Sequence, residues 1–297
     1  MRRSFFAIIF AAAIAVNAPI ATAQQSVAKP DSSGYVVANG VNYWFEIRGK
    51  GDPLVLLHGG LFSTELFGPV LTRLAETRRV IGIDQQGHGH TSLGRPTINP
   101  VDIGRDLGVV IQKLGLKQVD VMGYSFGGAN ALQLAFQNPA LVRRLVLVST
   151  VYAQDGFFAE MLPQQAAVSA AIADQMKDTP IYKTYAAIAP RPQEFPKLLD
   201  AMGAWMRTPY NWSESVKKLS MPVMLVYGDA DMITPEHVVS FYKLLGGGLK
   251  DAGWTRENMS SNRLAILPDL THYEVGAAPI LATTVLPFLD GKTHHKP

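Results

Sequence analysis

The stretch "VDVMGYSFGGANALQ", residues 119 to 133, places a single serine, Ser125, between the end of an apolar run and the start of a helical pattern. Gly123, Gly127 and Gly128 surround this serine, although a glycine inside a strand or helix costs roughly 0.5 to 1 kcal/mol relative to alanine. The spacing fits G-x-S-x-G, in which glycines permit a sharp turn from strand to helix that leaves the serine hydroxyl exposed above the sheet. The stretch therefore predicts a serine nucleophile at the carboxyl end of a buried strand.

Short apolar runs alternate along the chain with segments of helical period. The runs cover residues 54–57, 79–84, 119–125, 144–149, 222–229 and 263–268, and the helical segments include 102–114, 127–137, 235–245 and 277–289. This alternation predicts an α/β fold with a mostly parallel central sheet and helices on both faces, because each crossover returns over the sheet. Ahead of these runs, "YVVANGVNYWFEIRG" contains two strand-like runs joined at Asn39-Gly40, which predicts an N-terminal β-hairpin.

One interval interrupts the alternation. The 72 residues between Ser149 and Pro222 contain no convincing strand but much Ala, Met and aromatic content. An unstructured loop of this length is improbable in a compact domain, so we expect a helical cap over residues 151–219, inserted after the sixth strand between core segments 24–150 and 220–297. Apolar cap residues could line a cavity or only join the cap to the core. We predict that the substrate contacts Leu61, Phe157, Trp205 and Met206.

The first 23 residues have the features of a secretory signal peptide. Arg2 and Arg3 precede an apolar stretch of twelve residues (5–16), and Ala21 and Ala23 form an A-x-A pattern before Gln24. The alternative is a membrane anchor, but twelve residues are short for a span of about 20. The sequence therefore predicts a periplasmic or secreted protein with no stable membrane span after cleavage.

Composition excludes several classes of function. The chain has 27 basic and 24 acidic side chains, and loss of Arg2 and Arg3 lowers the formal net charge from +3 to +1. Nucleic-acid binding depends on clustered Lys and Arg, so we expect no nucleic-acid partner. The chain has no cysteine, which excludes disulfides and a thiol nucleophile. No cofactor-binding loop is present, and nothing in the sequence specifies an oligomeric state.

A serine hydroxyl needs a base within hydrogen-bond reach and an acid that orients the base. His272 follows the last predicted strand, where we expect a loop to present its imidazole to the carboxyl edge of the sheet. Asp231 lies beyond the preceding strand, in "VYGDADMITP", and we predict that it is the acid. Spacing leaves Asp229 as an alternative for this role. The order Ser125, Asp231, His272 is the one expected for a triad on a parallel α/β sheet.

An oxyanion requires donors that are already in place. The amide that follows the nucleophile, the N–H of Phe126, is one candidate. The second is expected from the loop "HGGLF", whose glycines let the backbone approach a substrate. We predict Gly60 as this donor, with Leu61 as the alternative.

Five motifs resemble the α/β-hydrolase fold, specifically its capped esterase, lipase and peptidase branch. They are, in order, "LHGGLFS", "DQQGHGHT", "GYSFGGANAL", "GDADMITP" and "LTHYEV", and the likeness extends from about residue 35 to 290. The resemblance implies catalytic roles for Ser125, for Asp231 in its G-x-x-D-x-x-x-P pattern and for His272, and an oxyanion amide at Gly60.

Two departures from related sequences narrow the expected chemistry. Proline-specific aminopeptidases of the family tend to show His-Gly-Gly-Pro-Gly, whereas this chain has Leu61-Phe62 after the glycines. Haloalkane dehalogenases and epoxide hydrolases use Asp where Ser125 stands. We expect a serine hydrolase that cleaves a small hydrophobic or aromatic carboxylic ester. A lactone, an amide and a carbon–carbon bond remain alternative targets of the same machinery. The alternative outside the enzymes is a non-catalytic binding protein of this fold.

His88 and His90, in "GHGH", raise the question of a metal site, because imidazoles are common zinc ligands. No carboxylate or further histidine adjoins the pair in the sequence. We therefore predict a glycine-rich loop after a strand and no metal.

Overall fold

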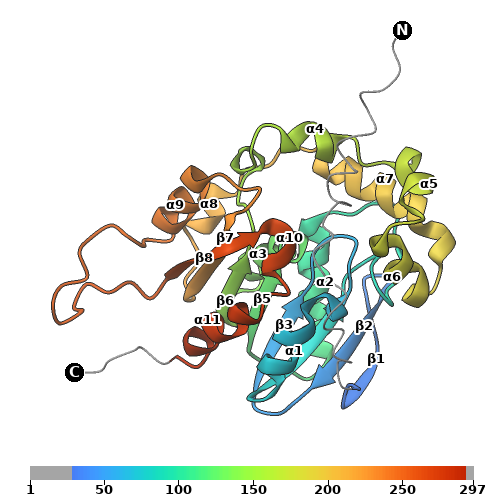
Figure 1. Cartoon of the computed structure of the whole chain (residues 1–297). Helices are drawn as coiled ribbons and strands as arrows, with labels where there is room; N and C mark the ends of the chain where they lie inside the picture. The colour runs from blue at the N-terminus through green and yellow to red at the C-terminus, as the bar shows by residue number, and fades with distance from the viewer. Residues whose placement is uncertain (1–28, 292–297) are drawn as a thin grey trace, which may run out of the picture.

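The computed structural model describes residues 29–291, so the predicted signal peptide lies outside the described residues. An eight-stranded sheet with the order β1-β2-β4-β3-β5-β6-β7-β8 forms the centre of the molecule (Figure 1). β1 and β2 are antiparallel to their neighbours, and the other strands run parallel. The strands are β1 (Ser32–Ala38), β2 (Val41–Arg48), β3 (Asp52–Leu57), β4 (Arg78–Asp84), β5 (Val119–Tyr124), β6 (Val142–Val148), β7 (Val223–Ala230) and β8 (Arg263–Thr271).

Helices cover both faces of this sheet, and each face has its own hydrophobic core. One core joins the sheet to α2, α3, α9 and the cap, and the other joins it to α1, α10 and α11. The helices of the main domain are α1 (Gly68–Ala75), α2 (Pro100–Lys113), α3 (Phe126–Gln137), α9 (Pro235–Leu244), α10 (His272–Val275) and α11 (Pro279–Leu289). The predicted α/β fold is confirmed. So is the hairpin, whose turn residues Asn39 and Gly40 have φ angles of 46° and 85°.

The structure departs from the expected elements in three places. It adds α1, which the apolar pattern did not reveal because only Val70, Leu71 and Leu74 of its eight residues are buried. β7 continues to Ala230, one residue past the apolar run of 222–229. The expectation that His272 lies on a loop is wrong, since this residue is the first of α10. Thr271 and Glu274 form a capping box there and satisfy the amides that begin the helix.

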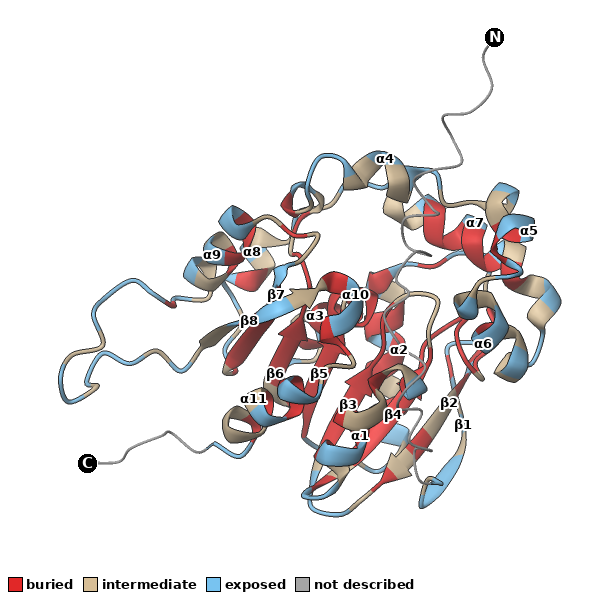
Figure 2. Ribbon diagram, viewed as in Figure 1, coloured by how far each residue is buried: buried red, intermediate tan, exposed pale blue. Residues whose placement is uncertain are grey.

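The segment between β6 and β7 is helical throughout most of its length. Its helices are α4 (Met161–Ala166), α5 (Ala173–Met176), α6 (Pro180–Ile188), α7 (Phe195–Met206) and α8 (Ser213–Val216). Figure 2 shows α4, α5 and α7 above the sheet and α6 lower at the right, below α5, and α7 has the most buried residues of these four helices. α8 instead lies beside α9, where Lys217 and α9 residues line one surface hollow. The cap that spans the carboxyl edge therefore consists of α4 to α7.

Two isolated bridges fix the start of this segment, one to its own end and one to the loop after β7. Ala153 pairs with Asn211, and Phe157 pairs with Ile233, which follows β7. His237 of α9 supports the same region, because its Nε2 accepts a hydrogen bond from the N–H of Tyr152 at 3.2 Å and its ring stacks on that of Tyr152. A buried neutral histidine thus fixes the entry of the cap.

We expect this histidine to make the protein sensitive to acid. Burial lowers the pKa of His237 to about 4, against an opposing effect of Asp155. The unfolded chain, with a histidine pKa near 6.5, therefore binds the proton first as the pH falls. The stabilisation is complete above about pH 6.5 and is lost towards pH 4, with a loss of about 2 kcal/mol by pH 5. Urea unfolding at pH 7 and pH 5 measures this effect. Between these two pH values, the free energy of unfolding of His237→Gln should fall by about 2 kcal/mol less than that of the wild type.

His90→Gln provides the matched control. A hydrogen bond to Asp84 raises the pKa of His90, so the folded protein binds this proton more tightly than the unfolded chain does. Replacing His90 should therefore not reduce the drop in the free energy of unfolding between pH 7 and pH 5. An equal drop in the free energy of unfolding of the wild type and of His237→Gln would contradict the role assigned to His237.

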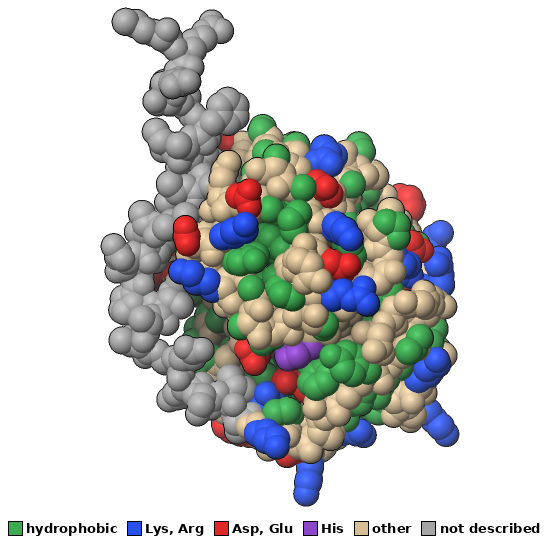
Figure 3. All heavy atoms as spheres, turned by 90° about the vertical axis from the view of Figure 1, so that its right-hand side faces the viewer, with side chains coloured by type: hydrophobic (Ala, Val, Ile, Leu, Met, Phe, Trp, Pro, Cys, Tyr) green, Lys and Arg blue, Asp and Glu red, His purple; other side chains and the backbone are tan. Residues whose placement is uncertain are grey.

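The molecular surface mixes charges of both signs. On the face shown in Figure 3, Lys and Arg side chains alternate with Asp and Glu side chains around a cluster of hydrophobic residues in its upper half. Within residues 29–291, no helix has the length and apolar character needed to cross a membrane.

Candidate active site

The turn between β5 and α3 holds Ser125 in a strained conformation. Its φ and ψ angles are 54° and −116°, a combination that side-chain-bearing residues rarely adopt. The N–H of Ser125 donates to Val148 O at 2.9 Å, which anchors the turn to β6. A methyl group on Gly123 would lie 2.4 Å from Gly127 O, and one on Gly127 would lie 2.3 Å from Leu57 O. Glycine is therefore required on both sides of the serine.

His272 lies within hydrogen-bond distance of Ser125. Its Nε2 is 3.0 Å from Ser125 Oγ, and its Nδ1 is 2.8 Å from Asp231 Oδ1. The imidazole is only 6% exposed, and the hydroxyl of Tyr124 donates to the carbonyl of His272 at 2.5 Å. Burial, with a smaller effect of the Asp231 charge, raises the pKa of Tyr124, so this hydroxyl stays protonated and holds α10 in place.

Asp231 and Asp229 have different partners. Asp231 accepts from His272 through Oδ1 and from the hydroxyl of Ser149 through Oδ2. Asp229 accepts from the N–H of Leu270 at 3.3 Å and so joins β7 to the end of β8. The structure thus brings Ser125, His272 and Asp231 together, and Asp229 lies outside this line of hydrogen bonds.

Ser149 is a residue that the sequence reasoning missed. It follows β6 directly and has a φ of 49°, a second strained residue at the carboxyl edge. The signal that could have revealed it is its position, because a polar residue directly after a buried parallel strand points to the edge where ligands bind.

The candidate oxyanion donors lie on two adjacent backbone segments. Phe126 is the first residue of α3, and the first amides of a helix have no partner within the helix. A methyl group built on Gly60 would lie 3.7 Å from Phe126 Cβ, so the loop after β3 adjoins this turn. Leu61, the alternative donor, has a φ of 65°, and this left-handed conformation turns the loop beside the cavity.

A cavity of about 250 Å³ opens at Ser125 and His272, between the carboxyl edge of the sheet and the cap. Its wall includes all four predicted substrate contacts, Leu61, Phe157, Trp205 and Met206, and also Gly60 and Phe126. The ring of Trp205 meets that of Phe126 edge to face, with centroids 5.2 Å apart. The cap and the loop after β3 thus enclose the serine in a largely apolar pocket.

The histidines of the "GHGH" loop lie near a carboxylate that the sequence reasoning did not associate with them. Asp84 Oδ2 is 2.8 Å from His90 Nδ1, and Asp84 Oδ1 is 4.0 Å from His58 Nε2. Burial lowers the pKa of His88 to about 3, so this ring is neutral at physiological pH. No set of three or more His, Asp or Glu side chains in residues 29–291 is arranged to hold a metal ion.

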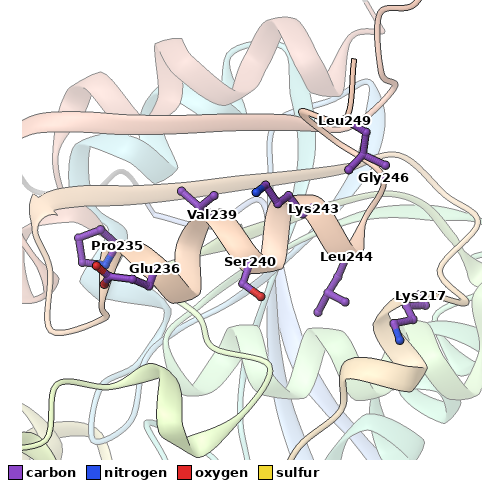
Figure 4. Close-up of a pocket in the computed structure, with 9 residues that line it drawn as sticks. All are labelled: Lys217, Pro235, Glu236, Val239, Ser240, Lys243, Leu244, Gly246 and Leu249. Carbon is purple, nitrogen blue, oxygen red and sulfur yellow. The ribbon is translucent and has the colours of Figure 1, made fainter. Parts of the chain in front are cut away.

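A larger hollow of about 870 Å³ lies on the outer surface of α9 (Figure 4). Val239, Ser240, Lys243 and Leu244 of the helix line it together with Leu249 and other residues. None of the residues that line it belongs to the cavity at Ser125, so the two sites are separate.

The fold and the arrangement at Ser125 define a hydrolase of the α/β class. The family model described as alpha/beta hydrolase fold matches residues 52–211, more than half of the chain. The chain belongs to this family.

Known relatives span several reactions. The chain is 34% identical over 125 residues to 2-hydroxymuconate semialdehyde hydrolase of Pseudomonas sp. (strain CF600), covering 41% of this chain and 44% of that protein. It is also 34% identical over 128 residues to proline iminopeptidase of Clostridioides difficile (strain 630), covering 40% and 44%. The chain thus spans less than half the length of the curated relatives it matches.

Solved structures agree on the fold. An esterase of Rhodococcus sp. ECU1013 superposes with a TM-score of 0.65 at 20% identity, covering 88% of this chain and all of that one. This likeness covers a larger share of the chain than the segment that the family model matches.

Proposed function

We propose that this protein is an exported serine hydrolase that cleaves a hydrophobic or aromatic carboxylic ester. The observation that carries the proposal is the line of hydrogen bonds from Ser125 through His272 to Asp231 at the base of an apolar cavity. Export rests on the signal-peptide pattern of residues 1–23 alone.

The proposed reaction is acyl transfer in two steps. Ser125 Oγ attacks the ester carbonyl while its proton passes to His272 Nε2, and Asp231 stabilises the resulting imidazolium. The N–H groups of Phe126 and Gly60 bind the oxyanion, where loss of one donor typically costs about 2.7 to 4 kcal/mol. The intermediate expels the alcohol, which takes the proton from His272. Water then loses a proton to His272 and attacks the acyl-enzyme. As the second intermediate breaks its bond to Ser125 Oγ and releases the acid, His272 returns that proton to Ser125 Oγ.

Cleavage of a carbon–carbon bond is the second candidate, because the chain resembles 2-hydroxymuconate semialdehyde hydrolase. The cavity supports it less well. A muconate-derived substrate carries a carboxylate, and none of the described residues of the cavity wall is a Lys or Arg that could bind it. Aminopeptidase activity is supported less well for a similar reason, since no Asp or Glu of residues 29–291 lines the cavity to bind a substrate ammonium group.

An activity screen tests the proposed function. The panel comprises p-nitrophenyl esters of graded acyl length, lactones, aryl amides, amino-acid amides and vinylogous diketones, with the Ser125→Ala protein as the blank. We expect Ser125-dependent turnover of the short and medium esters. Turnover of a diketone with no esterase activity would favour the carbon–carbon hydrolase.

A further inference from the structure

Within residues 29–291, the side chains that line the cavity at Ser125 carry no formal charge. These residues come mainly from the loop after β3, the β5–α3 turn, the segments after β6 and β7, and helices α4, α7 and α10, and none of them is Lys, Arg, Asp or Glu. Arg207 lies next to this wall without lining the cavity. Its guanidinium donates to the carbonyls of Ala166 and Val168, at 3.0 and 3.1 Å, which fixes it on the cap backbone.

Several polar side chains of the wall donate hydrogen bonds to the backbone. Gln154 Nε2 donates to Met206 O at 2.7 Å, and Gln164 Nε2 donates to Glu160 O at 3.2 Å. Thr150 Oγ1 donates to Val148 O at 3.1 Å. A charged group on a bound substrate would therefore lose its water without meeting an opposite charge on the described residues of the wall.

The remaining wall is apolar and adaptable. Met161, Met202, Met206 and Met232 come from both the cap and the segment after β7, and methionine side chains adjust to irregular apolar shapes. The carboxylate of Asp231 lies directly behind His272, so a second negative charge in this small cavity would also meet like-charge repulsion.

We infer that this site selects electrically neutral esters and discriminates against esters that carry a carboxylate or an ammonium group on the acyl chain. The inference rests on the proposed ester hydrolysis and adds its substrate class. The discrimination comes from the free-energy cost of removing water from a charged substrate group beside uncharged side chains. A neutral acyl chain of the same shape fits the same space without this cost.

Three ethyl esters of similar shape test the inference. Ethyl 4-methylpentanoate is neutral, monoethyl succinate replaces its two terminal methyl groups with carboxylate oxygens, and ethyl 4-aminobutanoate ends in an ammonium group. Ethanol release gives kcat/KM for each. We expect the neutral ester to exceed the anionic one by at least about 100-fold and the cationic one by at least about tenfold. Values within threefold of each other for the neutral ester and either charged ester would overturn the inference.

Variants of Gln165 test the electrostatic cause. Gln165 lines the cavity from α4, so Gln165→Arg adds a cation to the wall and should lower the neutral-to-anionic ratio at least tenfold, while Gln165→Leu should leave this ratio unchanged. A ratio that Gln165→Arg does not alter, in a protein that still hydrolyses the neutral ester, would overturn the inference. Absence of Ser125-dependent turnover of all three esters would instead overturn the proposed esterase function.

Discussion

Replacing Ser125 with alanine is expected to lower kcat/KM for p-nitrophenyl butyrate by at least about 10⁴-fold. The substitution removes the only hydroxyl that lies 3.0 Å from His272 Nε2 among the described residues, and with it the acyl-enzyme route. The cavity and the oxyanion amides remain, so a small residual rate above that of water is expected. Initial rates at substrate concentrations well below KM measure the effect.

Two further measurements separate chemistry from folding. A fluorophosphonate should label the wild type at Ser125 and leave Ser125→Ala unlabelled, because only an activated serine reacts quickly. Ser125→Gly should be equally inactive but more stable than Ser125→Ala by about 1 kcal/mol, since glycine adopts a φ of 54° without strain. Wild-type turnover by Ser125→Ala would contradict the proposed nucleophile.

Replacing Asp231 with asparagine is expected to lower kcat by about 10³ to 10⁴-fold. In the wild type, Asp231 accepts from His272 Nδ1, which keeps the proton on that nitrogen and leaves Nε2 free to accept the proton of Ser125. Asparagine is neutral and can donate to Nδ1, so it stabilises the wrong tautomer and no longer stabilises the imidazolium. Single-turnover acylation with p-nitrophenyl butyrate reports this step directly.

Asp229→Asn is the matched control. Asp229 Oδ1 accepts from Leu270 N, and the amide oxygen of asparagine can accept the same bond, so kcat should stay within about threefold of wild type. A large loss in Asp229→Asn together with a small loss in Asp231→Asn would reverse the two assigned roles.

Local sequence patterns were sufficient for the elements that short-range forces determine. The glycines around Ser125 predict the turn after β5 because only glycine fits beside Leu57 O and Gly127 O. The Asn39-Gly40 dipeptide predicts the hairpin because both residues adopt positive φ. The alternation of apolar runs with helical segments predicts the parallel sheet, since a buried parallel strand is apolar on both faces.

These local patterns did not predict helix α10 or the end of β8. The strand was expected to end near Pro268, but it continues to Thr271, past Asp269 with a φ of 59°. The capping box then begins α10 at His272. A register shift between Gly228 and Ala230 likewise alters the path of β7 just before Asp231. Irregularities of this kind follow from pairing with neighbouring strands, which a single segment does not encode.

The sequence alone predicted the family, which the comparisons confirm, and it also predicted a serine nucleophile with a histidine base and an aspartate acid, because spacing and order along the sequence carry that information. Tertiary structure decided which aspartate faces His272, why Ser149 contacts that aspartate, and which cap side chains enclose Ser125. His272 and Ser125 are separated by 147 positions and meet because β5, β6, β7 and β8 are consecutive in the sheet and end at one edge. The cavity wall in turn depends on how α4 and α7 pack over that edge, and packing among distant segments sets the shape and charge that select a substrate.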